Sequence, residues 1–528
     1  MAIYEDNELD VPFVYDGMTQ FNRVNSYGRT SVIEPDAMAS ALNMDLNRTV
    51  ARTRRGIEQL GGLPEILNPS GTVSGPIQGA GFLDVLTGTG LQRLLVVVNK
   101  LPCKWDGTTW SPLLSSYTPA TGTQQVCMAA LVDKLYLATA GKNLYSWDGV
   151  SFVDIGTGSG SLPPQFTLIC KHTYRLFGAG LPNAGDTLQC SDILDPTVWM
   201  PLQNSSRVGG GESDPITALC SWTDYNLVVG KRNSIWLVNA DPTQTPANWQ
   251  MKQVTDVAGC VSHRSMCMVG NDVFWLSNDG VRSIEYTLQG LTQGVSEPIS
   301  RPIQDVIDRI NWTAAGGACA RYWKNRYILS VPLDTSTTNN AVLVYNTITQ
   351  SWSGTWTGWN ASIFVPTFFG GAARLAMGRA DGLVAQWMEY VPEVAEVGAN
   401  FMDMGQPYAS NATTRALTCN EAISPKKGFS AEVEFWQSTA QGTVSVILDG
   451  GAPQPFWDGA TEGASGSVID DPLPLTLGVL KFWRIARDLM AFGSWREIQF
   501  QFSTTAGKMQ VRSLYLEAQI EKFQAEIN

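Results

Sequence analysis

The sequence predicts an all-β protein whose central part is a β-propeller, and three observations support this fold. Only 16% of the 528 residues are charged, whereas 10% are aromatic and 50 residues are glycine, a composition typical of turn-rich β proteins. Trp-Asp-Gly occurs at Trp105 and again at Trp147, 42 residues later (147 − 105), which is about the length of one propeller blade. Strand-turn-strand patterns continue at similar intervals to about residue 392. They predict six to eight blades.

The two Trp-Asp-Gly units indicate how each blade is expected to fold. Leu94–Leu113 and Leu135–Ile155 each read as a strand, a turn, a second strand that reaches the tryptophan, an Asp-Gly turn and a third strand. The glycine supplies the positive φ that a tight hairpin turn needs, and the aromatic residue before it is expected to pack against the neighbouring blade. Weaker versions of the unit are expected in Leu188–Trp199, Asn226–Asn239, Asp272–Tyr286, Arg326–Trp352 and Arg374–Tyr390.

The character of the sequence changes outside this block, which predicts three consecutive parts. Residues 1–80 show few strand patterns and are expected to form an extended N-terminal arm with docking strands. The propeller is expected over residues 81–395, and residues 396–528 are expected to form a C-terminal β-sandwich-like module that ends in a terminal arm.

Five alternating segments predict the strands of the C-terminal module. Trp457-Asp458-Gly459 lacks a strand pattern before it and is expected to be a turn within the loop Asp449–Gly466. Glu517–Asn528 has helical spacing and is expected to be the arm. The predicted strands are Ala431–Trp436, Thr443–Leu448, Lys481–Ala486, Glu497–Phe502 and Gln510–Leu516.

Charge and hydropathy exclude several classes of protein. The 36 basic and 48 acidic residues give a formal net charge of −12, whereas a protein that grips DNA phosphates needs the opposite sign. No apolar run approaches the ~18 residues of a membrane-spanning helix, and the densest, Leu94–Val98, has the length of a strand. The acidic N-terminus predicts no secretory signal.

Nine cysteines without a CxxC pair predict free buried thiols in a protein folded in a reducing cytoplasm.

Motifs of catalysis and cofactor binding are absent from the sequence. Only two histidines occur, His172 and His263, and no GxSxG, HExxH or phosphate-binding loop accompanies them. We expect His263 to be a solvated or hydrogen-bonded loop residue. No catalytic, cofactor-binding or metal-binding residue is therefore predicted, and an enzyme is not expected. A carboxylate pair for glycoside cleavage stays open, because the sequence does not give the separation of carboxylates.

One basic cluster, formed by Arg48, Arg52, Arg54 and Arg55, has two interpretations. As a functional site, it would be a docking surface for an acidic neighbouring subunit or for the DNA backbone. Alternatively, it is a solvated segment whose arginines point outward.

Three segments carry a resemblance to a known family. Ala41–Gly61 reads A-x-N-x-x-L and then V-x-x-x-R-x-G-x-x-x-L-G. Cys260–Asn311 contains Phe274–Ser277 followed directly by Asn278-Asp279-Gly280, and Phe482-Trp483-Arg484 lies near the C-terminus. Together they resemble the nozzle or hub proteins of short-tailed bacteriophages, also called tail tubular or packaged-DNA stabilisation proteins.

This resemblance implies a structural virion protein, folded in the host cytoplasm and located in the tail. Its partners would be its own copies in a homohexameric tube, the portal-adaptor ring, and tail fibres or a tail tip, with double-stranded DNA passing through the lumen. Six copies would carry a formal charge of 6 × −12 = −72, which would repel DNA phosphates and limit friction.

Two other interpretations stay open. One is another virion component, such as a fibre-attachment or head-completion protein. The other is a carbohydrate-binding propeller or a glycosidase, which would need aromatic platforms and carboxylates gathered at one mouth of the propeller. Under the virion interpretation, the polar hairpin tip Asp334–Asn340 is expected to contact neighbours or fibres, so that its deletion would impair assembly and not folding.

Overall fold

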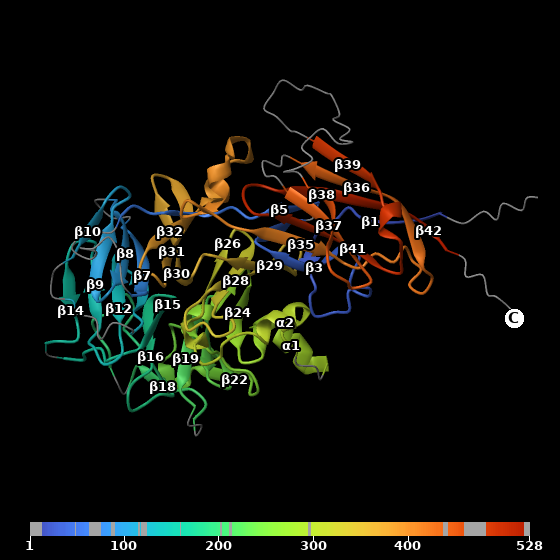
Figure 1. Cartoon of the computed structure of the whole chain (residues 1–528). Coiled ribbons are helices and arrows are strands. Elements are labelled where there is room, and N and C mark those ends of the chain that lie inside the picture. The colour runs from blue at the N-terminus through green and yellow to red at the C-terminus, as the bar shows by residue number, and fades with distance from the viewer. Residues whose placement is uncertain are drawn as a thin grey trace, which may run out of the picture. The chain divides into compact units, whose positions relative to one another are not determined.

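The computed structural model shows a chain built mainly of β-strands, which form two compact units (Figure 1). One unit comprises residues 57–348 and 357–390, and we call it the propeller unit. The other comprises residues 1–56, 349–356 and 391–528, and we call it the sandwich unit. The structure describes residues 13–521 except 48, 63–74, 86–89, 114–116, 118–123, 159, 201–202, 211–213, 294–296, 437–441 and 459–481.

The propeller unit begins with four antiparallel sheets of four strands each, whose strands are paired in chain order. The first two sheets comprise β7 (Ile77–Asp84), β8 (Gln92–Val98), β9 (Leu101–Trp105) and β10 (Trp110–Pro112), then β11 (Cys127–Leu131), β12 (Lys134–Ala138), β13 (Tyr145–Trp147) and β14 (Phe152–Asp154). The next two comprise β15 (Leu168–His172), β16 (Arg175–Ala179), β17 (Thr187–Cys190) and β18 (Ser205–Arg207), then β19 (Ile216–Ser221), β20 (Asn226–Lys231), β21 (Ile235–Asn239) and β22 (Gln250–Thr255).

Shorter sheets and two helices complete this unit. The sheet strands are β23 (Cys267–Val269), β24 (Asp272–Ser277) and β25 (Gly280–Ser283), then β26 (Cys319–Trp323), β27 (Arg326–Val331) and β28 (Ala341–Asn346), and finally β30 (Ala361–Phe369), β31 (Ala372–Arg379) and β32 (Val384–Trp387). The helices are α1 (Ile284–Gln293) and α2 (Gln304–Ile307), with 3-10 turns η1 (Pro246–Asn248), η2 (His263–Ser265), η3 (Arg301–Ile303), η4 (Ala315–Gly317) and η5 (Met388–Tyr390).

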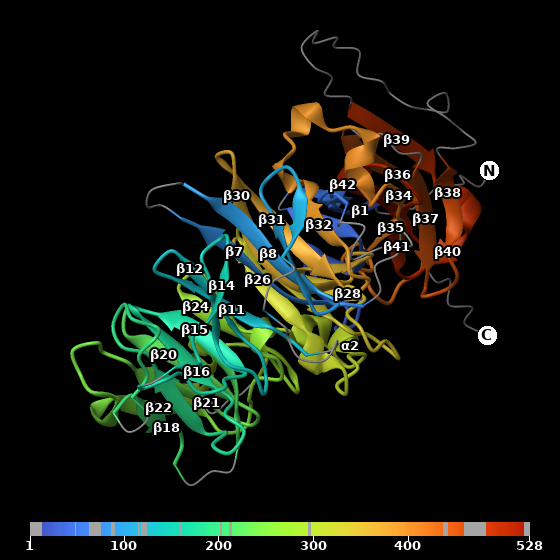
Figure 2. The ribbon, with the colours of Figure 1, turned by 90° about the vertical axis from the view of Figure 1, so that its left-hand side faces the viewer.

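These sheets form a closed ring. Their first strands, β7, β11, β15, β19, β23, β26 and β30, neighbour one another in this order, and β30 lies beside β7 (Figures 1 and 2). The last sheet takes its outer strand from earlier in the chain, because β6 (Ile57–Gln59) pairs with β32. A ring of small sheets is a β-propeller. The predicted fold is therefore confirmed, and the predicted helix-poor composition with it.

The Trp-Asp-Gly units fold as predicted. Gly107 and Gly149 have φ of 103° and 94°, values that residues with a Cβ rarely adopt. The carboxylate of Asp106 accepts the Thr109 backbone N–H at 2.8 Å, and Asp148 makes the equivalent bonds in its own turn. The aspartate therefore closes each turn by satisfying backbone donors.

The apolar run in β8 is explained by packing on both of its faces. Leu94, Val96 and Val98 cluster with residues of β30 and β31, whereas Leu95 and Val97 cluster with residues of β12 and β13. Successive side chains of a strand point to opposite faces. A blade enclosed between two neighbours therefore needs a continuous apolar strand and not an alternating one.

The sandwich unit contains two packed sheets. One has the order β39-β36-β42-β5-β4, with β1 beside β42 and β40 beside β36. In the other, β29, β3, β35, β41, β37 and β38 follow one another, with β2 beside β3. Phe435 of the first sheet lies 5.8 Å from Trp457 and 6.4 Å from Phe502 of the second, between ring centroids. Two sheets that share an aromatic core form a β-sandwich.

The strands of this unit come from both ends of the chain. They are β1 (Phe13–Met18), β2 (Arg23–Val24), β3 (Ala37–Leu42), β4 (Met44–Asn47), β5 (Val50–Thr53), β29 (Ser351–Thr357), β33 (Met402–Asp403), β34 (Gln406–Pro407), β35 (Ser410–Thr414), β36 (Lys426–Trp436), β37 (Gly442–Leu448), β38 (Gln454–Asp458), β39 (Phe482–Asp488), β40 (Ser494–Trp495), β41 (Ile498–Thr504) and β42 (Gln510–Ile520). Its 3-10 turns are η6 (Glu393–Ala395), η7 (Gly398–Phe401) and η9 (Met490–Phe492).

The structure differs from the sequence predictions in three places of this unit. Residues 1–80, expected to be an extended arm with docking strands, supply β1 to β5 to this unit, and β1 pairs with β42 so that Phe13 lies opposite Gln519. Trp457, expected in a turn, belongs to β38 and lies opposite Val444. Glu517, expected in an arm of helical spacing, belongs to β42. Each short segment becomes a strand because a partner strand is available.

In the described part of the chain, no helix is long and apolar enough to cross a membrane.

Candidate functional site

The basic cluster predicted from the sequence lies in the sandwich unit and has internal acidic partners. Arg54 is fully buried and donates two hydrogen bonds to the Asp403 carboxylate, one of them at 2.9 Å. Its guanidinium also lies 4.0 Å from the centroid of the Tyr408 ring. Arg55 contacts Glu396 at 2.6 Å. Buried charges need such partners, because an unpaired charge in an apolar interior is very costly.

The remaining described arginine of the cluster follows the same pattern. Arg52 lies 3.2 Å from Asp45 and 2.7 Å from Glu393. Lys508 adds a second cation to Glu396, at 2.6 Å. Arg48 lies outside the described residues. These guanidinium groups do not form the solvated, outward-pointing segment that we considered. Their ion pairs explain the basic segment without an external partner.

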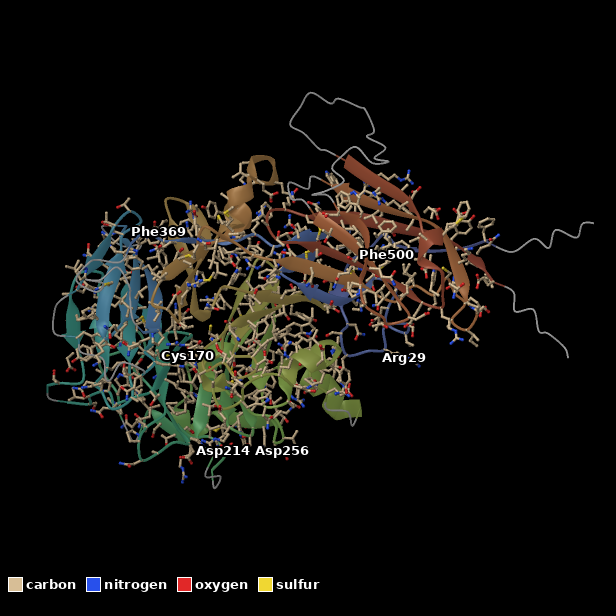
Figure 3. The ribbon with its side chains drawn as sticks, in the orientation of Figure 1. Arg29, Cys170, Asp214, Asp256, Phe369 and Phe500 are labelled. Atoms are coloured by element: carbon tan, nitrogen blue, oxygen red, sulfur yellow. The ribbon has the colours of Figure 1, made fainter. Side chains whose placement is uncertain are left out.

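A cavity of about 720 Å³, open to solvent, lies at the centre of the propeller ring. The innermost strands line it, and five of the nine cysteines lie there: Cys127, Cys170, Cys220, Cys267 and Cys319 (Cys170 is labelled in Figure 3). They belong to β11, β15, β19, β23 and β26, the first strands of five successive sheets. All nine cysteines are free, as predicted, but only six of them are buried, and Cys127, Cys170 and Cys267 are half-buried.

Each cavity thiol lies in the seam between its own blade and the next. Cys127 Sγ donates to the carbonyl of Ile169 on β15 at 3.3 Å, and Cys319 Sγ donates to the carbonyl of Ala361 on β30 at 3.4 Å. At the other three thiols, Ser221, Met268 and Tyr322 of the following strands act as backbone donors to the sulfur. Cys170 and Cys220 Sγ donate to carbonyls of their own strands, those of Lys171 and Ser221. A small, weakly hydrogen-bonding side chain suits this narrow seam.

Cys127 differs from the other four thiols because an imidazole lies beside it. His263, on η2, places its Nε2 3.2 Å from Cys127 Sγ. The backbone N–H of Leu219 donates to His263 Nδ1 at 3.3 Å, so the neutral ring carries its proton on Nε2 and donates it toward the sulfur. The sulfur also accepts the Ile169 N–H at 3.5 Å. This arrangement stabilises a thiolate but does not supply a general base, because Nε2 already holds a proton.

The pKa of Cys127 is shifted in the opposite direction to those of the neighbouring cavity thiols. Burial raises the pKa of Cys127, but the charge that His263 carries when protonated, the His263 hydrogen bond, the Ile169 backbone and the Arg264 charge outweigh it and hold that pKa below its ordinary value. Burial raises the pKa of Cys170, Cys267 and Cys319 to about 12. Because the thiolate is the nucleophilic form of cysteine, Cys127 is the candidate nucleophile of the cavity.

Arg264 holds the innermost strands together beside this pair. Its guanidinium donates to the carbonyls of Gln78 and Val126, the latter at 3.4 Å, and to that of Ser362 at 3.1 Å. These carbonyls lie at β7, before β11 and on β30, so one cation bridges three blades. Among the described residues, no group of three or more His, Cys, Asp or Glu could hold a metal ion.

A second cavity, of about 510 Å³, lies at the hairpin turns β15–β16 and β19–β20. Tyr174 and Tyr225 line it and are 59% and 50% exposed, and Trp222 and Asp224 line it as well. His172 lines the same cavity but is buried, and burial lowers its pKa. Exposed aromatic rings beside a carboxylate provide stacking and hydrogen-bonding groups for a polar ligand.

The polar hairpin tip Asp334–Asn340 is hydrogen-bonded to the rest of the propeller, whereas the sequence suggested a loop available for external contacts. Asn339 is only 5% exposed, and its Nδ2 donates to the carbonyls of Gly317 at 2.9 Å and Ala361 at 2.7 Å. Deletion of Asp334–Asn340 would therefore remove internal hydrogen bonds of the propeller. A loss of assembly after this deletion would therefore not separate a defect in assembly from a defect in folding.

The sequence did not predict the thiol cavity, although it contained a signal. Successive cavity cysteines are spaced by 43 (170 − 127), 50 (220 − 170), 47 (267 − 220) and 52 (319 − 267) residues, close to the length of a blade. A residue type that recurs with the blade period occupies equivalent positions. The proximity of His263 to Cys127, 136 residues away, had no such signal.

Comparisons with known proteins give no function. No protein-family model matches the chain, and no curated protein matches its sequence. Among solved structures, the chain is similar to BBS1N in complex with ARL6DN, in a crystal soaked with mercury, with 14% identity, coverage of 65% of this chain and 99% of that chain, and a TM-score of 0.42. It is also similar to YCF48 bound to D1 peptide, with 13% identity, coverage of 63% and 97%, and a TM-score of 0.36. Function must be argued from the residues.

Proposed function

We propose that this protein is a non-enzymatic structural subunit of the tail of a short-tailed bacteriophage. Six copies would form a nozzle or hub that docks below the portal-adaptor ring, carries fibres or a tail tip, and conducts double-stranded DNA. The observation that carries the proposal is the place of Ala41–Gly61, which resembles a family signature found ahead of a propeller. This segment supplies β4 and β5 to the sandwich unit and then β6, which closes the propeller.

The excess of acidic residues supports a conduit that does not bind the DNA passing through it. Acidic residues outnumber basic ones by 48 to 36, and the three described arginines of the basic cluster are occupied by internal acids. These three arginines are therefore not available for phosphate contacts, which would hold DNA during ejection.

The DNA path would lie between subunits and not through one propeller. The central cavity of about 720 Å³ has the volume of a small-molecule site, and Arg264 bridges three blades at its wall. A conduit for a duplex therefore requires a ring of copies, whose contacts must close at a fixed rotation.

The test is the mass of the purified protein by light scattering, with electron microscopy of the same sample and of the protein mixed with tailless virus heads. We expect a six-fold ring with an opening wide enough for duplex DNA, either alone or on the heads. A duplex titration at low ionic strength should show no binding. A monomer that ignores heads, or a ring that binds duplex DNA with a steep salt dependence, would contradict the proposal.

A second candidate function is binding of a saccharide, which the cavity at the β15–β16 and β19–β20 turns favours. Tyr174, Trp222 and Tyr225 could stack on sugar rings, and Asp224 could accept hydroxyl hydrogen bonds. Glycan-array binding that is lost in Tyr174→Ala and Tyr225→Ala, but kept in the equally exposed Val153→Ala (52% exposed), would support it. A blank array would exclude it.

A further inference from the structure

The central cavity of the propeller has a charge opposite to that of the whole protein. Its lining contains Lys171, Arg264 and Arg321, and among the described residues that line it there is no Asp or Glu. Lys171 and Arg321 are exposed residues of β15 and β26. Cations grouped in a concave site attract small anions and raise their local concentration.

Cys127 is exposed to the same cavity. It is half-buried and not fully enclosed, and His263 Nε2 lies 3.2 Å from its sulfur. The Leu219 N–H fixes the opposite side of the imidazole, and the Ile169 N–H gives the sulfur a second donor. Two donors aimed at one sulfur stabilise negative charge on it.

We propose that the cavity is an anion-directed thiol modification site, in which small anionic electrophiles bind to the cationic lining and react at Cys127. With a haloacetate as the model reagent, the Cys127 sulfur forms a bond to the CH₂ carbon while the carbon–halogen bond breaks. The halide leaves, the thiol proton passes to solvent, and the product is a carboxymethyl thioether.

Cys170 provides the matched control within the same cavity. It lies on the corresponding first strand of the next blade, two residues nearer the hairpin turn, and is half-buried as well. Its sulfur donates to the Lys171 carbonyl at 3.4 Å, whereas the cavity imidazole bonds to Cys127. If seam position alone determined reactivity, both thiols would react alike.

The experiment treats the full-length native protein with iodoacetate or with neutral iodoacetamide and follows each cysteine by peptide mass spectrometry. We expect Cys127 to react first with both reagents and several-fold faster than Cys170, because the His263 and Ile169 donors stabilise its thiolate, which is the nucleophilic form. The rate ratio of iodoacetate to iodoacetamide at Cys127 should exceed the ratio for free cysteine.

Variants separate the contribution of the His263 hydrogen-bond donor from that of the Lys171 and Arg321 cations. His263→Leu should slow Cys127 with both reagents, and a melting curve shows whether the variant is folded. Lys171→Gln and Arg321→Gln alter exposed side chains, so they should lower only the iodoacetate rate, by a few-fold. Cys127→Ser should abolish the fast label and leave that of Cys170 unchanged.

Three results would overturn this proposal. They are equal rates at Cys127 and Cys170, a reagent ratio at Cys127 equal to that of free cysteine, and labelling of Cys127 only after denaturation. None of them bears on assembly into a ring, so this inference and the proposed virion function can fail separately.

Discussion

The propeller unit and the sandwich unit join their strands over very different distances along the chain. In the propeller, β12 pairs with β13 and β13 with β14, so that Trp147 lies opposite Phe152. In the sandwich, β1 pairs with β42, and Phe13 lies opposite Gln519. Local hairpins leave turn signals in the sequence, whereas pairing between the two chain ends leaves none. The difference explains why the propeller was predictable and the N-terminal strands were not.

The two units also use their carboxylates differently. Asp106 and Asp148 of the propeller accept backbone N–H groups two and three residues ahead. In the sandwich, Asp403 and Glu396 pair with arginines more than 340 positions away, at Arg54 and Arg55. The propeller turns are stabilised locally, and the sandwich depends on buried charges brought together by folding.

The largest expected effect of a single change is at the buried ion pair of the sandwich. Asp403→Asn leaves the Arg54 guanidinium, which is fully buried, without its counter-charge. We expect a loss of about 3–5 kcal/mol in the free energy of unfolding, measured by denaturant titration. Hydrogen exchange should accelerate in β36 and β42 and stay unchanged in β8 and β12.

The matched control is Asp334→Asn in the propeller, where Asp334 pairs with Arg309 at 2.9 Å and both side chains are 55% exposed. Exposed pairs contribute little, so stability should stay close to that of the parent. Equal losses in the two variants would contradict the proposed difference between the units.

A smaller effect is expected from acid. Burial raises the pKa of Glu396, but hydrogen bonds and charges from Lys508 and Arg55 outweigh it and hold the pKa below its ordinary 4.5. A carboxylate with a lowered folded pKa stabilises the fold above its unfolded pKa, and this stabilisation is lost as pH falls through the folded value.

Glu396→Gln should therefore destabilise the sandwich by about 2 kcal/mol at neutral pH and reduce the acid sensitivity of hydrogen exchange in this unit. Titration of unfolding free energy between neutral pH and pH 3 measures both effects. An unchanged acid dependence in the variant would assign acid sensitivity to other groups.

The smallest effect is expected at a propeller turn. Gly149→Ala forces a residue with a Cβ to a φ of 94°, at a cost of about 1–2 kcal/mol. Val150→Ala, at the next position and 65% exposed, is the control and should change the melting temperature very little. A Gly149→Ala variant that melts with the control would mean that the turn relaxes.

The predictive value of the sequence was highest for elements that are complete within a few residues. Asp272–Tyr286 and Arg374–Tyr390, expected to be weaker versions of the unit, contain the hairpins β24–β25 and β31–β32. Trp457 was assigned to a turn because no strand pattern precedes it. Its strand, β38, is short and pairs with β37 through a register shift. Arg54 was recognised as part of a basic cluster, but its partner Asp403 is 349 positions away. No spacing rule could identify that pair.

The sequence by itself determined the repeating part of this protein. A Trp-Asp-Gly turn carries its own conformational preference and its own large apolar residue, so the blade and the propeller follow from local chemistry. Only the tertiary structure decided which distant groups meet. It joined the two chain ends into one sandwich, paired Arg54 with Asp403, and placed His263 beside Cys127. The physical reason is that contacts between distant residues depend on ring closure and burial, which no single segment specifies.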